Sequence, residues 1–406
     1  ARAAVGAAVT PTALNGLRVL DLSRVLAGPY AAQVLADLGA DVIKIERPGR
    51  GDDTREWAPP RMTLASASPL EQSVCCWTCN RGKRSATADI GDPQGQALVQ
   101  RLAADADVII ENYKVGTLAR YGLDYDSLRV LNPRLVYCSI TGFGQTGPYR
   151  ERPGYDTIVQ ALGGLMSITG NADGEPGGGP RKSGLAVADQ MTALYSVIAI
   201  LAALRERQVS GQGQQIDMSL LDVKVAALTN IGMNYLATGE VPHRMGNWLA
   251  TVYPSDTYTC EDGEIMLIVG NDEQFRRFCA AMGLDGVSQD ARFARNPNRL
   301  QNAQALEPLV RSAFARRKVA DCQVLLDEAG VPAATINNIE QVFANPQVVA
   351  RDLVRVVPGP DGGTARLIAN PIRMSRTPLR DACRAPKLGE HSDEVQHGWP
   401  AVNPGV

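Results

Sequence analysis

The sequence is poor in the residues that mark several common kinds of site. Of its 406 residues only three are histidine, and the formal net charge is -2. A chain this close to neutral gives no reason to expect nucleic acid or an anionic membrane as a partner. The longest uninterrupted apolar run, Val197 to Leu204, is far shorter than the roughly 18 residues needed to span a bilayer. We therefore expect a soluble protein with neither a nucleic-acid nor a membrane partner.

Cysteine is present but lacks the spacing of a disulfide framework or a zinc motif. The eight cysteines are spread along the chain, apart from a cluster at Cys75, Cys76 and Cys79. The pair Cys76 and Cys79 has the spacing of a zinc or redox motif, but no second CxxC follows and histidines are scarce. We expect reduced thiols and no metal site.

The first half of the chain alternates between strand and helix patterns. Residues 17–22 and 41–46 are expected to be strands, with a helix over 29–38 between them, and residues 93–106 form a helix before a strand at 108–111. Residues 135–140 complete the pattern as another strand. This order predicts an α/β, Rossmann-like fold with a parallel sheet covered by helices, which binds its ligand beyond the carboxyl ends of the strands.

The pattern changes after Gly239. Residues 256–269 have the signature of a hairpin, followed by a helix over 272–282, which indicates a second, α+β domain. From about Pro358 the chain is rich in proline, as expected of a tail that crosses a surface.

The segment Gly142-Phe-Gly-Gln-Thr-Gly147 fits the GxGxxG pattern of dinucleotide-binding proteins. That pattern must open directly into a helix, whose amino end meets the pyrophosphate. Here Pro148 and Pro153 keep the chain irregular, and the first strand-to-helix turn lacks the pattern. We therefore do not expect a nicotinamide or flavin cofactor.

Basic residues gather just after the expected strand ends. They are Lys44, Arg47, Arg50, Arg81, Lys83, Arg84, Lys114 and Arg120. A cofactor that carries several phosphates needs such cations at this edge of the sheet. Solvated loop charges are the alternative interpretation.

Asp189 stands where a long apolar helix is expected to begin, ending near Arg207. Its position alone favours a helix cap over a catalytic group. A carboxylate at a helix amino end is also expected to keep a low pKa and to remain a nucleophile at neutral pH. The two roles are compatible, and the glycine-rich segments before it favour chemistry.

The chain resembles the class III CoA-transferase family, the formyl-CoA and carnitine CoA-transferase group that also includes alpha-methylacyl-CoA racemase. The order and spacing of the shared segments make the resemblance specific. These segments are Leu17-Arg-Val-Leu-Asp-Leu22, Val25-Leu-Ala-Gly-Pro29, Asp37-Leu-Gly-Ala-Asp-Val-Ile-Lys-Ile-Glu-Arg47, Gly51-Asp-Asp-Thr-Arg55, Asn80-Arg-Gly-Lys-Arg-Ser85, Asp107-Val-Ile-Ile-Glu-Asn112, Thr141-Gly-Phe-Gly-Gln-Thr-Gly-Pro148, Gly211-Gln-Gly-Gln214 and Leu388-Gly-Glu-His-Ser-Asp-Glu394.

The resemblance implies that Asp189 attacks an acyl-CoA thioester, forming a mixed anhydride and then an aspartyl-CoA thioester that passes CoA to a free acid. Coenzyme A is then a substrate, and no tightly bound cofactor or metal is required. The residues implied to bind CoA are Val25, Leu26, Ala27, Arg47, Ala88, Asn112, Tyr113, Arg120, Arg152 and Tyr155.

The resemblance also implies an interlocked homodimer of ring-shaped subunits, with the large domain built from both chain ends. We expect residues 1–205 to form the first part of the large domain and 206–240 a linker. Residues 241–335 form the small domain, and 336–406 form a return linker and the rest of the large domain. The family's glycine-rich substrate loop is replaced by Arg244-Met-Gly-Asn247.

Two other functions remain open. A racemase on the same fold needs a base on each face of the reacting carbon, but the histidine of those relatives is Tyr155 here, and an unperturbed tyrosine titrates near pH ~10. A non-catalytic acyl-CoA binding protein would tolerate any residue at position 189, so the aspartate there argues against it.

The substrate follows from a finer resemblance, to enzymes that use succinyl-CoA with glutarate, itaconate, mesaconate or citramalate. It lies in Arg24-Val-Leu-Ala-Gly-Pro29, Tyr137-Cys-Ser-Ile-Thr-Gly142, Gly270-Asn-Asp-Glu-Gln-Phe275 and Asn337-Asn338. The far carboxylate of a dicarboxylic acid needs a cation, for which Arg55, Arg152 and Lys182 are the candidates. The Ala/Arg-rich start, with no acid before Asp21, leaves bacterial cytoplasm and mitochondrial matrix both open.

Overall fold

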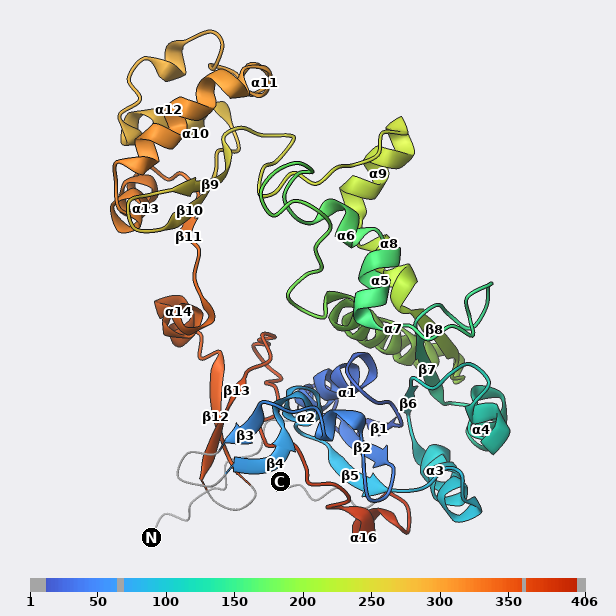
Figure 1. The fold of residues 1–406 in the computed structure, drawn as a ribbon. Coiled ribbons are helices and arrows are strands. Elements are labelled where there is room, and N and C mark those ends of the chain that lie inside the picture. Colours follow the sequence, from blue (N-terminus) through green and yellow to red (C-terminus); the bar gives the residue numbers. More distant parts are fainter. Residues whose placement is uncertain (1–11, 64–68, 360–362, 400–406) are drawn as a thin grey trace, which may run out of the picture. The chain divides into compact units, whose positions relative to one another are not determined.

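The computed structural model describes residues 12–63, 69–359 and 363–399, so most of the Ala/Arg-rich start lies outside these ranges (Figure 1). The chain divides into two compact units. The first unit comprises residues 1–165, 182–240 and 349–406, and the second comprises residues 166–181 and 241–348. Residues 166–181, assigned above to the large domain, therefore belong to the second unit, where Arg181 bonds through its backbone to Thr169 and the Arg244 guanidinium donates to the Ser167 carbonyl.

A six-stranded, fully parallel sheet forms the centre of the first unit, in the order β5-β2-β1-β6-β7-β8. The strands are β1 Arg18–Asp21, β2 Asp41–Glu46, β5 Arg84–Thr87, β6 Val108–Glu111, β7 Val136–Thr141 and β8 Gln215–Ser219. Most of these strands are buried on both faces, which explains their continuous apolar runs. The expected parallel, helix-covered sheet is confirmed.

Helices cover both faces of this sheet. One face, with Val19 and Val108, packs against α1 Ala27–Asp37 and α7 Val187–Ser210. The opposite face, with Leu20 and Ile109, packs against α3 Pro93–Asp105 and α4 Tyr125–Leu131. Consecutive strand residues thus enter different cores, as the two-residue period of a strand requires.

Helix α7 is long and apolar enough to cross a membrane, by length and composition alone. The sequence expectation rested on the short uninterrupted run and did not anticipate this. In the structure one face of the helix, including Val197, Ile200 and Ala203, packs in the core against α1 and the sheet. A core helix can have the composition of a membrane span, and burial accounts for this face of α7, whereas Leu194 and Ile198 on the rest of the helix are exposed in this chain.

Residues 206–240, predicted as a linker, are structured and belong to the first unit. It contains the end of α7, the edge strand β8, and helices α8 Leu220–Ala226 and α9 Thr229–Thr238. Ile216 and Met218 of β8 pack on the core, and the Ser219 side chain caps α8 by accepting from the Asp222 N–H. Gly213 lets the chain approach Leu135 just before β8, since a Cβ there would lie 2.0 Å from the Leu135 carbonyl oxygen.

The other elements of the first unit surround this framework. They are η1 Asp53–Arg55, β3 Arg61–Thr63, β4 Pro69–Ser73, α2 Val74–Asn80, η2 Leu118–Tyr121, α5 Asp156–Leu162, the hairpin β12 Val354–Pro358 with β13 Thr364–Ile368, and α16 Ser392–Val395. Two short helices, α6 Leu165–Ile168 and α15 Pro346–Ala350, lie at junctions between the units along the chain.

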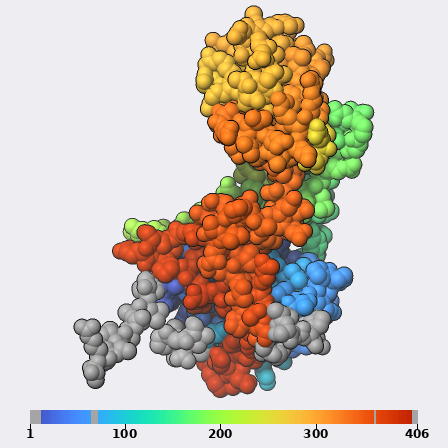
Figure 2. Space-filling view, turned by 90° about the vertical axis from the view of Figure 1, so that its left-hand side faces the viewer, coloured from blue at the N-terminus to red at the C-terminus, as the bar shows by residue number. Residues whose placement is uncertain are grey.

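The C-terminal segment crosses the surface of the first unit, as the sequence predicted; it is red in Figure 2. The backbone of His391 donates to the Ser85 carbonyl, and the Pro386 carbonyl accepts from the Arg55 guanidinium. Both chain ends therefore contribute to the large unit, as the family resemblance implies.

The second unit has a small antiparallel sheet of order β11-β10-β9, packed against helices. Its elements are β9 Ser255–Thr259, β10 Glu264–Ile268, α10 Asp272–Met282, η3 Val287–Gln289, α11 Asn296–Gln301, α12 Ala303–Ala315, α13 Val319–Glu328, β11 Ala333–Thr335 and α14 Ile339–Ala344. Phe275, Phe278, Phe314 and Tyr258 stack in its core. The predicted hairpin and the helix after it are confirmed.

The GxGxxG-like segment does not open into a helix, since α5 begins only at Asp156. Its first glycine serves close packing instead. A Cβ on Gly142 would lie 2.6 Å from the Gly154 Cα, so two backbone segments touch there.

Two lysines that the sequence placed among ligand-binding cations are buried structural groups. The Lys83 ammonium donates to Asp21 Oδ2 at 2.7 Å, to the Pro29 carbonyl at 2.8 Å and to Asn80 Oδ1 at 2.9 Å. Lys44 pairs with Asp52 at 2.9 Å and donates to the Ser23 carbonyl at 2.7 Å. Both lysines tie the first strand end to neighbouring elements.

Replacing Lys83 by methionine should destabilise the fold, because it leaves Asp21 buried without one of its cations. We expect the free energy of unfolding to fall by about 3–5 kcal/mol, measured by urea denaturation. The exposed Lys318 offers the matched control, and Lys318→Met should change it by less than about 0.5 kcal/mol. Equal effects of the two variants would contradict the structural role of Lys83.

Candidate active site

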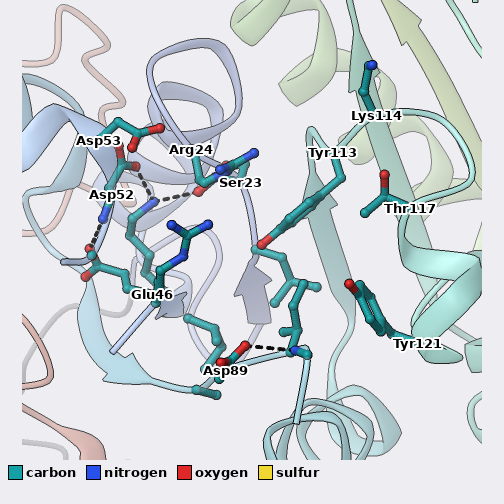
Figure 3. Close-up of a pocket in the computed structure, with 18 residues that line it drawn as sticks. Ser23, Arg24, Glu46, Asp52, Asp53, Asp89, Tyr113, Lys114, Thr117 and Tyr121 are labelled. Atoms are coloured by element: carbon teal, nitrogen blue, oxygen red, sulfur yellow. Dashed lines mark hydrogen bonds and ion pairs between the residues drawn. The ribbon is translucent and has the colours of Figure 1, made fainter. Parts of the chain in front are cut away.

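A cavity of about 380 Å³ opens at the carboxyl ends of β1, β2, β5 and β6 (Figure 3). Each strand contributes its last residues or the turn that follows it. The lining includes Leu22, Ser23, Arg24, Lys44, Ile45, Glu46, Arg47, Gly51, Asp52, Asp53, Ala88, Asp89, Ile90, Gly91, Tyr113, Lys114, Thr117 and Tyr121. The cavity therefore lies at the edge of the sheet where the sequence predicted a ligand.

The charges that line this cavity divide into paired and unpaired groups. Lys44 and Asp52 neutralise one another, and Glu46 binds Arg55. Arg24, Arg47 and Lys114 form no ion pair within the described residues. Two further carboxylates line the cavity: Asp53 lies 3.9 Å from Arg50, and Asp89 forms no ion pair within the described residues. Three unpaired cations against one unpaired carboxylate leave the cavity suited to phosphate groups.

Arg24 is a cavity residue that the sequence reasoning did not list. Its guanidinium lies over the Tyr113 ring, 4.9 Å from the centroid. Its Nε is buried and has no hydrogen-bond partner among the described groups. Burial raises the pKa of the Tyr113 phenol, so this ring remains neutral beside the arginine. The position of Arg24 in the first strand-to-helix turn was the signal that could have identified it.

Three of the residues implied to bind CoA line this cavity: Arg47, Ala88 and Tyr113. Two other expected residues, Asn112 and Val25, do not line the cavity but form hydrogen bonds to residues that do. The Asn112 side chain accepts from the Arg24 N–H at 2.8 Å and donates to the Arg24 carbonyl at 2.6 Å, and the Val25 N–H donates to the Asp52 carboxylate at 3.2 Å.

The remaining expected residues lie outside the cavity lining. Leu26 precedes α1 and Ala27 is its first residue. Arg120 is exposed and donates to Thr117, while Arg152 lies over the Tyr149 ring and Tyr155 is exposed.

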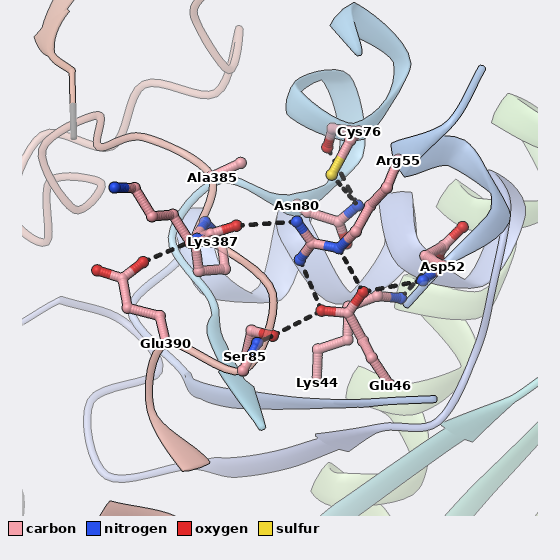
Figure 4. Close-up of polar contacts among 12 residues, drawn as sticks. Lys44, Glu46, Asp52, Arg55, Cys76, Asn80, Ser85, Ala385, Lys387 and Glu390 are labelled. Atoms are coloured by element: carbon pink, nitrogen blue, oxygen red, sulfur yellow. Dashed lines mark hydrogen bonds and ion pairs between the residues drawn. The ribbon is translucent and has the colours of Figure 1, made fainter. Parts of the chain in front are cut away.

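Arg55, expected as a substrate cation, is buried and fully engaged (Figure 4). Its Nε and Nη2 donate to the two Glu46 carboxylate oxygens at 2.7 Å and 2.6 Å. Its Nη1 donates to the Pro386 carbonyl at 3.2 Å. This two-point pair leaves Arg55 without a free edge for a substrate carboxylate. Lys182 differs, because it is exposed and, within the described residues, donates only to the Ser183 carbonyl next to it.

Asp189 is the third residue of α7, and it does not cap that helix. The cap comes from Asp156, the first residue of α5, whose Oδ1 accepts from the Ala188 N–H at 2.8 Å and the Asp189 N–H at 3.4 Å. Gln160 holds Asp156 in place by donating to its Oδ2 at 2.6 Å. The Asp189 carboxylate is therefore free of a structural bond within the described part of the chain.

The expected low pKa of Asp189 is wrong. Burial, and then the nearby Asp156 charge, raise the pKa of Asp189 to about 7. The helix amino end favours the carboxylate, but its N–H groups are already satisfied by Asp156. Desolvation and a like charge outweigh what remains of that effect.

The fold and these residues define an α/β protein with a cation-lined cavity at the carboxyl edge of its sheet and a free carboxylate of raised pKa at a helix start. A model of CoA-transferase family III matches residues 14–392. The chain belongs to CoA-transferase family III, and it is a CoA-transferase.

Relatives with assigned activities are similar over nearly the whole chain. The succinate–glutarate CoA-transferase of Agrobacterium fabrum is 50% identical over 382 residues, which is 94% of each chain. The human succinyl-CoA:glutarate CoA-transferase is 38% identical, over 94% of this chain and 85% of that protein. A crystal structure of a CAIB/BAIF family protein from Brucella suis has a TM-score of 0.84 at 46% identity, covering 95% of this chain and 99% of that one.

The raised pKa of Asp189 predicts a pH-dependent gain in stability for Asp189→Asn. An unfolded aspartate ionises near pH 3.8, whereas the folded one ionises near pH 7, so folding disfavours the charged form. The gain should be absent below about pH 4, grow between pH 4 and 7, and stay constant above pH 7.

Urea denaturation at pH 4, 6 and 8 measures this gain. The exposed Asp285 provides the control, because Asp285→Asn should give no such increase with pH. A gain for Asp189→Asn that is already complete at pH 4 would contradict the raised pKa.

Proposed function

We propose that the protein transfers CoA from succinyl-CoA to a free dicarboxylic acid such as glutarate or itaconate, by way of covalent intermediates on Asp189. Similarity over 94% of both chains to a relative named succinate–glutarate CoA-transferase is the single observation that carries this substrate class. A relative from Chloroflexus aurantiacus, 37% identical, is named succinyl-CoA–D-citramalate CoA-transferase, which supports dicarboxylates in general.

The reaction begins when an Asp189 carboxylate oxygen attacks the thioester carbonyl of the donor. The C–S bond breaks, CoA leaves as the thiolate, and a mixed anhydride remains. The thiolate then attacks the Asp189 acyl carbon, releasing succinate and leaving an aspartyl-CoA thioester. The acceptor carboxylate attacks this thioester, and the returning thiolate captures the new acyl group and frees Asp189.

The pKa of Asp189 suits this chemistry. A pKa of about 7 leaves roughly half of the groups ionised at pH 7 and nearly all at pH 8. A carboxylate of higher pKa is also the more reactive nucleophile when it is ionised. Partial burial excludes water that would hydrolyse the anhydride.

The cation-lined cavity is our proposed site for the nucleotide part of CoA. Arg47, Arg24 and Lys114 would bind phosphate, and Ala88 and Tyr113 would lie beside the adenine. Val25, Leu26, Ala27, Asn112, Arg120, Arg152 and Tyr155 stay part of the prediction, on the family resemblance alone.

We also propose that the protein is soluble, in a bacterial cytoplasm or a mitochondrial matrix, and that it forms the interlocked homodimer of its family. Helix α9 supports an assembly, because it buries none of its residues in this chain and leaves Met233 and Leu236 exposed. Apolar side chains in one exposed group mark an interface.

The wild-type protein should convert succinyl-CoA and a dicarboxylic acid to a new acyl-CoA, and Asp189→Ala should form none. Mass spectrometry with a panel of glutarate, itaconate, mesaconate and citramalate measures both results. Hydroxylamine should inactivate the wild type only after succinyl-CoA is added, because only then is an aspartyl thioester present. Asp285→Asn serves as control, and a wild-type rate for Asp189→Ala would exclude the covalent mechanism.

Arg47→Ala should weaken CoA binding and leave turnover nearly unchanged. A phosphate contact is made equally in the ground and transition states, so its loss raises KM rather than lowering kcat. We expect a rise in KM for succinyl-CoA of about 10-fold or more, the size of one charge-assisted hydrogen bond. Arg205→Ala, at an exposed site on α7, is the control. A loss confined to kcat would remove Arg47 from the phosphate site.

A further inference from the structure

Lys224 on α8 is a buried cation without a partner. The residue is 4% exposed, and within the described residues its side chain forms no hydrogen bond and no ion pair. A charged residue this little exposed is uncommon in a folded protein unless its charge is paired. Lys44 and Lys83, the other buried lysines, each hold two or more oxygen atoms.

Lys224 lies on a helix that packs against the two helices whose first turns carry the proposed nucleophile and its neighbour Asp156. Helix α8 packs against both α5 and α7, which carry Asp156 and Asp189 at their first turns (Figure 1). The lysine stem crosses the backbone of Gly163, where a Cβ would lie 2.5 Å from the Lys224 Cγ. The glycine at this position therefore leaves room for the stem beneath α5.

Asp156 attracts Lys224 but does not pair with it. This attraction opposes the burial that lowers the pKa of the Lys224 ammonium. Both Asp156 oxygens are occupied, Oδ1 by the start of α7 and Oδ2 by Gln160. The three ammonium N–H groups of Lys224 consequently remain available to another acceptor.

We infer that Lys224 binds the far carboxylate of the dicarboxylate substrate while its near carboxyl group reacts at Asp189. The inference rests on the proposed function and names the residue that selects dicarboxylates. Donor acyl group and acceptor acid react in turn at the same nucleophile, so one cation can serve both succinyl and glutaryl groups. A buried cation is favoured for this task over Arg152 and Lys182, which are exposed, because water screens an exposed charge.

The test compares dicarboxylates with monocarboxylates of equal length. For Lys224→Met, kcat/KM with succinyl-CoA and glutarate should fall by about 30-fold or more, since the far carboxylate is left without a partner. The change with butyryl-CoA and pentanoate should stay within about 3-fold, because these substrates have no far charge. Lys224→Arg should restore part of the dicarboxylate reaction. Lys318→Met should change neither reaction.

Each result decides the inference. Equal losses on both substrate pairs, or no loss on either, would overturn it while wild-type transfer to glutarate leaves the proposed function standing. A wild-type protein that transfers CoA to no acid would overturn both. Circular dichroism and elution volume establish that the variants fold and assemble. If Lys224→Met fails there, Lys224→Gln gives the same comparison with a buried polar side chain retained.

Discussion

The buried ion pairs at the ends of β1 and β2 are the constraint on which the large unit depends. The Glu46 carboxylate accepts two hydrogen bonds from the Arg55 guanidinium, and the Lys44 ammonium lies between Asp52 and Asp21. Burying one member of such a set alone would cost far more free energy than the pair. These residues must therefore be fixed together, and with them the turn after β1, the start of η1 and the Pro386 carbonyl of the C-terminal segment. These pairs therefore hold the residues of the cavity wall together.

The same pairing decides which cations are left for a ligand. Glu46 and Asp52 face the cavity but are neutralised by Arg55 and Lys44, so they do not repel an anion there. Arg24, Arg47 and Lys114 are then uncompensated. At the start of α7 the arrangement is the reverse, because Asp156 lies beside Asp189 and neither carboxylate forms an ion pair in the described structure. One unit therefore contains both a cavity with uncompensated cations and a carboxylate of raised pKa.

Much of the fold followed from local pattern, whereas the site followed only in part. Strand 41–46 and the helix over 93–106 were predictable because buried parallel strands and capped helices have strong sequence signals. The pairing of Arg55 with Glu46 spans nine positions, and that of Arg55 with Pro386 spans 331. No local sequence pattern distinguishes a cation with such a distant partner from an unpaired one. For this reason Arg55 was predicted to bind the substrate, and Lys224 was not considered.

Three polar groups of the first unit that have no side-chain partner among the described residues lie where chemistry or binding is proposed. Natural sequences satisfy nearly all buried polar groups, and exceptions point to function or to a missing ligand. The Arg24 Nε lacks a partner at the cavity, Asp189 lacks a donor at the helix start, and Lys224 lacks an anion beneath α5. Each costs stability in the ligand-free chain, and each would be satisfied by one part of an acyl-CoA with a second carboxylate: phosphate, reacting carbonyl and far carboxylate. If Lys224 binds as inferred above, a monocarboxylate would leave its ammonium unpaired, whereas the far carboxylate of a dicarboxylate would satisfy it.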